Sequence, residues 1–199
     1  MAMQNRTVLL FDIMDTLVYN PFNREVPAFF GLSRAALVEQ KDLTAWEQFE
    51  LDQIDEAEYF RRYFLDGRTF VWSEFRLMMR NAYRWIDGAE ELLERLSCSG
   101  FEIHALSNYP VWYRTIESKL CLSRYLKWTF VSCLTGVRKP ATAAFHGPSL
   151  TLNRPLESFL LIDDNAENCA AAKANGMSAI HFVGAHDLLS QLQFRGLVQ

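Results

Sequence analysis

The sequence lacks an uninterrupted apolar stretch of the roughly 20 residues that a membrane-spanning helix needs, and no apolar stretch of signal-peptide length precedes its first candidate strand. It also lacks an excess of positive charge: 20 Lys and Arg stand against 24 Asp and Glu, giving a formal net charge of −4 at pH 7. Such a chain offers no basic footprint for nucleic acid or for an anionic membrane. We therefore expect a mature, soluble monomer or small homo-oligomer, with neither nucleic acid nor a membrane among its partners.

Cysteine is scarce as well. Cys98, Cys121, Cys133 and Cys169 are scattered, with neither the close pairs of a zinc site nor the density of a disulfide scaffold. They predict reduced, partly buried thiols in a reducing compartment.

Short apolar runs alternate with amphipathic segments along most of the chain, which is typical of a parallel sheet covered by helices. One helix is predicted between Asp87, as its N-cap, and Gly100, and another between Asn165 and Asn175. The predicted strands span residues 7–11, 101–106, 128–134, 159–162 and 179–183. The expected fold class is therefore α/β, with a Rossmann-like parallel sheet as its core.

Between residues 20 and 84 the pattern changes, because strand-type runs disappear and helical spacing takes over. Ser33 and Asp42 are plausible N-caps, and Asp55 begins a capping-box pattern. The segment therefore predicts a helical insertion after the first strand.

The insertion suggests a division of the chain into two domains. At 199 residues and 50% hydrophobic content, the chain can bury one substantial core together with a smaller helical unit. We expect residues 1–19 and 85–199 to form the core domain and residues 20–84 to form a helical cap domain. Because the cap is joined to the core at both ends, it can hinge over a site as a lid.

Carboxylates directly follow two of the predicted strands, with Asp12 after the first and Asp163 and Asp164 after a later one. Residues at the carboxyl ends of neighbouring parallel strands converge, so these acids are expected to meet in one crevice. Each acid alone could simply cap a helix. Adjacent carboxylates repel unless a cation neutralises them, however, and Mg²⁺ prefers such oxygen ligands. Asp12 could then attack phosphorus as a nucleophile.

Three further polar residues lie between these acids in the chain. Ser107 and Asn108 follow the second predicted strand and could hold phosphoryl oxygens, although Ser-Asn is also a common turn composition. Lys139 could place a positive charge between a phosphate and the carboxylates, or it could be a surface lysine before a helix. Separately these signals are weak, and their order along the chain strengthens them.

This order resembles the four-motif signature of the haloacid dehalogenase (HAD) superfamily, and the insertion sits where one type of cap lies in that family. The resemblance extends over residues 7–183. It implies a phosphatase that uses Mg²⁺ and an aspartyl-phosphate intermediate to hydrolyse a small phosphorylated metabolite. The implied roles are nucleophile and metal ligand for Asp12, phosphoryl binding for Ser107 and Asn108, orientation of nucleophile and phosphate for Lys139, and metal binding for Asp163 and Asp164.

One position departs from the family pattern. Family phosphatases usually carry an Asp two residues after the nucleophile as general acid and base, whereas this chain has Met14 there and Asp15 one place later. Asp15 could reach the leaving group from its different position, or the substrate or a water could supply the proton. Such acid–base help contributes roughly 10²–10⁴-fold in rate. The backbone carbonyl of Met14 can still coordinate Mg²⁺.

Two other functions stay open at this point. Dehalogenases of the superfamily also lack the second Asp, but their attack on carbon needs no metal, and the Asp163–Asp164 pair would then be an uncompensated repulsion. A catalytically weak protein that binds phosphate esters is the other alternative, motivated by Met14.

The insertion carries a closer resemblance. Asp12–Leu17, Asn20–Phe22, Val26–Gly31 and Thr44–Glu47 are similar to a plant and algal branch described as flavin mononucleotide (FMN) hydrolases, in which the unusual Met is part of the pattern. This implies FMN or a similar metabolite as the substrate. Because plastid members carry a transit peptide and none is visible here, we expect either the cytoplasm or the plastid stroma.

Aromatic side chains of the insertion are compatible with a flavin substrate. They could stack a planar ring at one or two positions, while most are expected to form the core of the insertion itself. These residues are Trp46, Phe49, Tyr59, Phe60, Tyr63, Phe64, Trp72 and Phe75.

Overall fold

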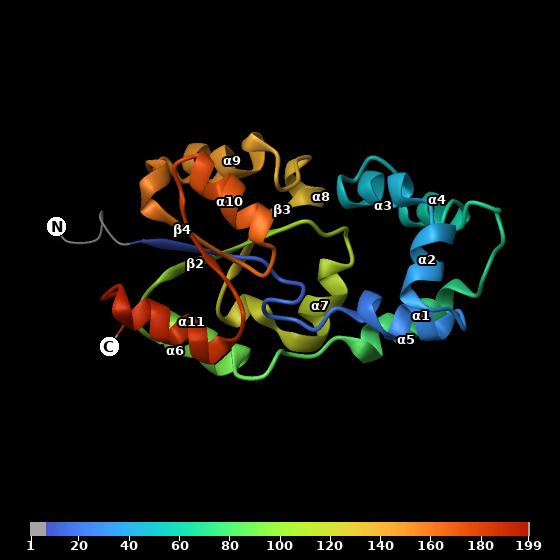
Figure 1. Ribbon diagram of the computed structural model, residues 1–199, viewed down its shortest axis with the longest axis horizontal. Helices are drawn as coiled ribbons and strands as arrows, with labels where there is room; N and C mark the ends of the chain where they lie inside the picture. Colours follow the sequence, from blue (N-terminus) through green and yellow to red (C-terminus); the bar gives the residue numbers. More distant parts are fainter. Residues whose placement is uncertain (1–6, 199) are drawn as a thin grey trace.

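The computed structural model describes residues 7–198 of the chain (Figure 1). The first six residues, for which we predicted no signal peptide, lie outside this range. Five parallel strands form one sheet in the order β3-β2-β1-β4-β5. They are β1 (Val8–Phe11), β2 (Glu102–Ser107), β3 (Lys127–Val131), β4 (Phe159–Asp163) and β5 (Ser178–His181). The predicted α/β, Rossmann-like fold is confirmed.

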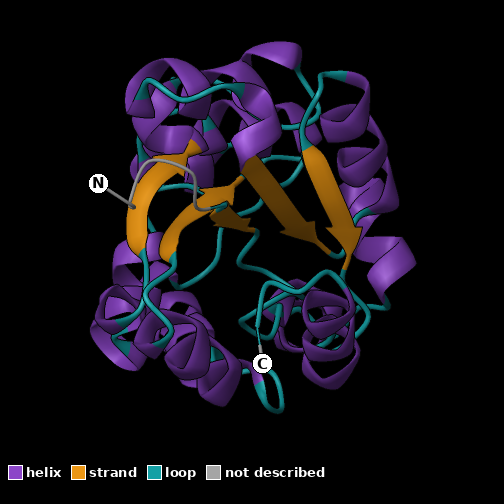
Figure 2. Ribbon diagram, turned by 90° about the vertical axis from the view of Figure 1, so that its left-hand side faces the viewer, coloured by secondary structure: helices purple, strands orange, loops and turns teal. Residues whose placement is uncertain are grey.

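Helices cover both faces of this sheet (Figure 2). One face carries α6 (Ala89–Cys98), α7 (Tyr113–Leu120) and α11 (Ala185–Phe194), and the other carries α9 (Thr142–Leu152) and α10 (Ala166–Ala174). The connections also contain the short helices η2 (Leu122–Arg124), α8 (Ser132–Thr135) and η3 (Leu156–Ser158).

The residues of β1 show how the sheet supplies both cores. Leu9 and Phe11 belong to the hydrophobic cluster under α6, α7 and α11, whereas Val8 and Leu10 belong to the cluster under α9 and α10. Successive side chains of a strand point to opposite faces, and here both faces are covered. All four side chains are fully buried, which explains the continuous apolar run before Asp12.

A series of short helices follows β1 and gathers at one end of the molecule, beyond the end of that strand (Figure 1). They are η1 (Pro21–Asn23), α1 (Glu25–Phe29), α2 (Arg34–Gln40), α3 (Leu43–Glu50), α4 (Glu56–Arg61) and α5 (Trp72–Ala82). The side chains of Ser33, Asp42 and Asp55 accept hydrogen bonds from backbone N–H groups in the first turns of α2, α3 and α4. The three predicted N-caps are therefore confirmed.

The insertion contains a compact group of aromatic rings. The ring of Phe75 is fully buried and lies with its centroid 5.4 Å from that of Phe70 and 5.5 Å from that of Phe29. Trp112, which precedes α7, extends this group toward the sheet, 5.6 Å from the ring of Tyr59. Burial of these rings stabilises helices that are too short to be stable alone.

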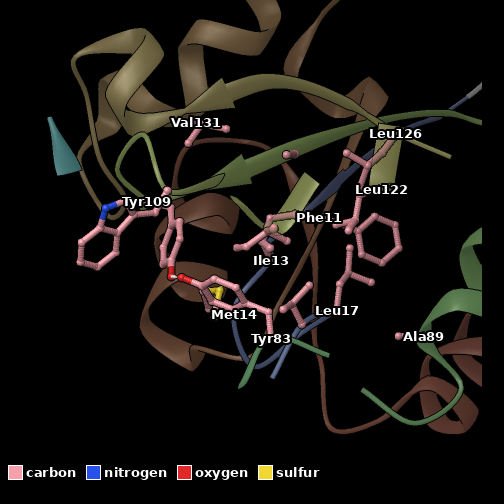
Figure 3. Close-up of a cluster of buried hydrophobic side chains, with 14 of the residues drawn as sticks. Phe11, Ile13, Met14, Leu17, Tyr83, Ala89, Tyr109, Leu122, Leu126 and Val131 are labelled. Atoms are coloured by element: carbon pink, nitrogen blue, oxygen red, sulfur yellow. Dashed lines mark hydrogen bonds between the residues drawn. The ribbon is translucent and has the colours of Figure 1, made fainter. Parts of the chain in front are cut away.

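Tyr83, at the end of α5, connects the insertion to the residues after β2. Its hydroxyl shares a buried hydrogen bond of 2.7 Å with the hydroxyl of Tyr109, and Met14 lies close to this pair (Figure 3). The pair places the return of the chain from the insertion directly beside the carboxyl ends of β1 and β2.

Two local predictions were wrong. The strand expected over residues 128–134 ends at Val131, because Ser132 begins α8 and its hydroxyl is engaged by backbone groups of Glu50 and Tyr109. Asp87 is not the N-cap of α6. That position is taken by Gly88, whose φ of 76° is left-handed.

The four cysteines, expected to be reduced and partly buried thiols, divide into two exposed and two buried side chains. All four are free, with Cys98 and Cys121 exposed and Cys133 and Cys169 buried. No helix within residues 7–198 combines the length and the apolar character needed to cross a membrane.

The aromatic core of the insertion predicts a large effect for Phe75→Ala. Because this ring is fully buried, its removal should lower the free energy of unfolding by about 3–5 kcal/mol, measured by urea denaturation. The matched control is Phe194→Ala, since Phe194 is 94% exposed and its loss should change stability by no more than about 0.5 kcal/mol. A loss below about 1 kcal/mol for Phe75→Ala would contradict this account of the insertion.

Candidate active site

The candidate site lies at the carboxyl ends of β1, β2 and β4. The sheet order reverses between β1 and β4, and an open α/β sheet forms its ligand crevice at such a reversal. Phe11 pairs with Ile162 in the sheet, and the N–H of Asp12 donates to the carbonyl of Ile162 at 2.9 Å. This register brings Asp12 beside Asp163, the last residue of β4.

Lys139 joins the two acids. Its ammonium donates to Asp12 Oδ1 at 2.9 Å and to Asp163 Oδ2, and the residue is only 2% exposed. Its backbone is fixed from the opposite side by Asn108, whose side chain accepts from the N–H and donates to the carbonyl of Lys139, both at 2.8 Å. Lys139 therefore lies in the site as predicted, and Asn108 holds the loop that carries it.

Asp163 has a dense set of hydrogen bonds. Besides Lys139, it accepts from the N–H of Asn165 at 2.8 Å and from the side-chain amide of Asn168 at 3.1 and 3.2 Å. These contacts occupy about all the acceptor positions of one carboxylate. Asp163 therefore orients the lysine, and it would have to give up one of these hydrogen bonds to bind a cation directly.

Asp164 lies at the more open side of the same cluster. Its backbone N–H donates to Thr16 Oγ1 at 3.1 Å, and the hydroxyl of Thr16 lies 3.4 Å from its Oδ1. Single carboxylate oxygens of Asp12, Asp163 and Asp164 all lie within 4.8 Å of one another. Oxygen ligands at this spacing suit a divalent cation such as Mg²⁺.

The electrostatics of the cluster follow from burial and crowding. Burial, helped by Asp163 and Asp164, raises the pKa of Asp12 to about 7 against the opposing effect of Lys139. Burial and the neighbouring Asp163 also raise the pKa of Asp164. Burial alone would lower the pKa of Lys139, but the two carboxylates that it contacts raise it above its ordinary value. The lysine is thus held in its charged form.

Ser107 ends β2 at the same edge of the sheet. The residue is 2% exposed, and its hydroxyl has no hydrogen-bond partner among the described residues. A buried hydroxyl without a partner is costly, so this one is a candidate donor to a bound substrate.

Met14 and Asp15 follow Asp12 at the start of the insertion. Asp15 has a left-handed φ of 59°, and its carboxylate accepts hydrogen bonds of 3.0 Å from each of the side-chain amides of Asn20 and Asn23. Met14 is nearly buried, and its side chain lines a pocket together with those two asparagines.

This pocket has a volume of about 270 Å³ and lies between the insertion and the edge of the sheet where Asn108 and Tyr109 follow β2. Asn108 and Tyr109 line it from the core, and Lys41, Trp46 and Glu50 line it from the insertion. Of the eight aromatic residues singled out from the sequence, Trp46 lines this pocket, whereas Tyr59, Phe60, Tyr63 and Phe75 are fully buried.

Several polar residues of this region were missed by the sequence analysis. Thr16 and Asn168 bond the acids, but only their spacing from Asp12 and Asp163 could have pointed to them. Lys41 gave no sequence signal, because it resembles any lysine at the end of a surface helix.

No family model matches the sequence. The chain is 43% identical over 190 residues to flavin mononucleotide hydrolase 1, a chloroplast protein of Arabidopsis thaliana, covering 96% of this chain and 78% of that protein.

Solved structures share the fold. A magnesium complex of a HAD family enzyme from Bacteroides thetaiotaomicron has a TM-score of 0.72 at 18% identity, over 88% of this chain and 92% of that one. An L-2-haloacid dehalogenase has a TM-score of 0.63 at 15% identity, over 95% of this chain and 99% of that one.

The chain belongs to the haloacid dehalogenase superfamily. Within it, the protein is a phosphatase that resembles flavin mononucleotide hydrolase.

Proposed function

We propose that this protein is a Mg²⁺-dependent phosphatase that hydrolyses FMN or a similar small phosphomonoester through an aspartyl-phosphate on Asp12. One observation carries the proposal: the ammonium of Lys139 holds Asp12 at the crevice, beside an acid cluster and the unpartnered hydroxyl of Ser107. Phosphoryl transfer requires a nucleophile, a cation site and a hydrogen-bond donor for the phosphoryl oxygens, and this crevice offers all three.

The proposed metal ligands are Asp12, Asp163, Asp164 and the backbone carbonyl of Met14. The three carboxylates supply only oxygen ligands, which fits Mg²⁺. To bind the cation directly, Asp163 would have to give up one of its present hydrogen bonds, such as one from Asn168. A bound cation would lower the pKa of Asp12 and neutralise charge on the phosphoryl group.

The chain's own residues then perform two displacements. Asp12 forms a bond to phosphorus while the bond to the substrate alcohol breaks, and Ser107, Asn108 and Lys139 bind the phosphoryl oxygens. Water attacks phosphorus in the second step, which releases inorganic phosphate and restores the carboxylate of Asp12. The departing alkoxide takes up one proton, and the attacking water loses one.

Asp15 is our proposed donor and acceptor of these protons. Its carboxylate bonds Asn20 and Asn23, and both asparagines line the pocket beside Met14. The alternative is that these hydrogen bonds only anchor the start of the insertion. A test must distinguish this structural role from proton transfer.

The substrate and the compartment rest on the relative. The 43% identity to an FMN hydrolase supports a flavin phosphate, and that relative's chloroplast location supports the plastid stroma, with the cytoplasm as the alternative. We propose residues 20–84 as a cap domain that covers the substrate. The dehalogenase alternative is less favourable, because metal-free attack on carbon leaves the acid cluster without a function.

The function is tested by release of inorganic phosphate from FMN. Release should require Mg²⁺, should stop in excess chelator, and should be lost in Asp12→Asn while the circular dichroism spectrum stays native. Asp87→Asn, a change at an exposed acid, should behave as the wild type. Release at a near wild-type rate by Asp12→Asn, or undiminished release in chelator, would refute the proposal.

The role of Asp15 is tested with two leaving groups. An alkyl phosphate leaves as a poorly stabilised alkoxide and needs a proton donor, whereas 4-nitrophenyl phosphate does not. Asp15→Asn should therefore reduce turnover of propyl phosphate by roughly 10²-fold or more and that of 4-nitrophenyl phosphate far less. Parallel losses for both substrates would assign Asp15 a purely structural role.

A further inference from the structure

Lys41 is an unusual lysine in the pocket between the insertion and the core. The residue is only 8% exposed, and its ammonium lies 4.6 Å from the ring centroids of both Phe22 and Trp46. The rings of Tyr63 and Tyr59 lie 5.0 and 5.6 Å away. Aromatic faces attract a cation, but they give it no hydrogen-bond acceptor comparable to water or a carboxylate.

The backbone holds this side chain in place. The N–H of Lys41 donates to the carbonyl of Leu37 at the end of α2, and Lys41 forms an isolated antiparallel bridge with Phe64. The next residue, Asp42, is the N-cap of α3. Lys41 is therefore fixed between two helices, and its side chain reaches a pocket that Met14 and Asn108 line from the catalytic side.

Within residues 7–198, the ammonium of Lys41 has neither an ion pair nor a hydrogen bond. The carboxylate of Glu50, which lines the same pocket, is instead paired with Arg138 at 3.1 Å. The hydroxyls of Tyr59 and Tyr63 are also buried without a partner among the described residues. Lys41 and the two tyrosines whose rings face its ammonium thus lack hydrogen-bond partners among the described residues, although buried polar groups are nearly always satisfied.

We infer that Lys41 is a specificity-determining residue that binds the carbonyl-bearing edge of a planar heteroaromatic ring on the substrate's leaving group. The ring would lie against Trp46 and Phe22, and the ammonium would donate to a ring carbonyl or ring nitrogen. Such a ligand supplies the hydrogen-bond acceptor that the lysine lacks. It also supplies a flat ring, which the aromatic lining of the pocket favours. The inference rests on the proposed function, whose substrate it narrows.

A purely structural role explains these observations less well. Burial lowers the pKa of Lys41 to about 7, against the opposing effect of Glu50, so the charged form is disfavoured in the free protein. A lysine that only filled space would be replaceable by an apolar residue at no cost to binding. A hydrogen-bond acceptor on a bound ligand would instead stabilise the charged form of Lys41.

The test compares Lys41→Met with the wild type on FMN and propyl phosphate. Both leaving groups are primary alkoxides, so the chemical step is matched and only the ring differs. The ratio of kcat/KM for FMN to that for propyl phosphate should fall at least about tenfold in Lys41→Met. Lys41→Gln, which keeps N–H donors, should lie between the two. Lys127→Met, at an exposed lysine on β3, should keep the wild-type ratio.

Binding of riboflavin, followed by its fluorescence, separates this inference from the proposed function. Riboflavin has the ring but no phosphate, so its binding needs no catalysis. Binding by the wild type that weakens at least about tenfold in folded Lys41→Met supports the inference, whether or not FMN is hydrolysed. No riboflavin binding by the wild type, or binding by Lys41→Met as tight as that of the wild type, would overturn it, while Mg²⁺-dependent release of phosphate could still hold.

Discussion

The buried ammonium of Lys139 is the interaction on which the site depends. Its single positive charge lies between Asp12 and Asp163 and reduces the repulsion of these two carboxylates, which neighbouring strands bring together. Burial of such charges is unfavourable unless the geometry is good and the remaining bonding positions are satisfied. Asn108 and Asn168 meet that condition, the first by holding the backbone of Lys139 and the second by bonding Asp163. The loop after β3 is thereby tied to the ends of the central strands.

The same loop also touches the insertion. Arg138, directly before Lys139, pairs with Glu47 at 2.9 Å and with Glu50 at 3.1 Å on α3. The hydroxyl of Ser132 donates to the backbone carbonyl of Glu50 at 2.6 Å. The ion pairs of α3 therefore lie one residue away from the lysine that holds Asp12. This contact physically connects the pocket lined by Trp46 and Glu50 with the acid cluster.

Much of the fold and the acid cluster could be predicted from the sequence, because parallel strands leave a simple signature: an apolar run that ends in a polar residue. Asp12, Ser107 and Asp163 all carry it. Thr16, Asn168 and Lys41 do not, since their positions depend on helix and loop packing that no local pattern encodes. The end of β3 was misjudged for a similar reason, because Ser132 is engaged by the distant Glu50. Asp15 was identified, but its bonds to Asn20 and Asn23 arise from a left-handed turn that the sequence did not indicate.

If Asp12 attacks phosphorus, it becomes phosphorylated during turnover. This can be measured by mixing the enzyme with FMN labelled on phosphorus, stopping the reaction in acid within one turnover, and mapping the labelled peptide. An acid-stable, hydroxylamine-sensitive phosphate is expected on the peptide that contains Asp12. The role of Asp12 would be contradicted if the enzyme releases phosphate steadily while the same quench traps label on another residue and none on Asp12.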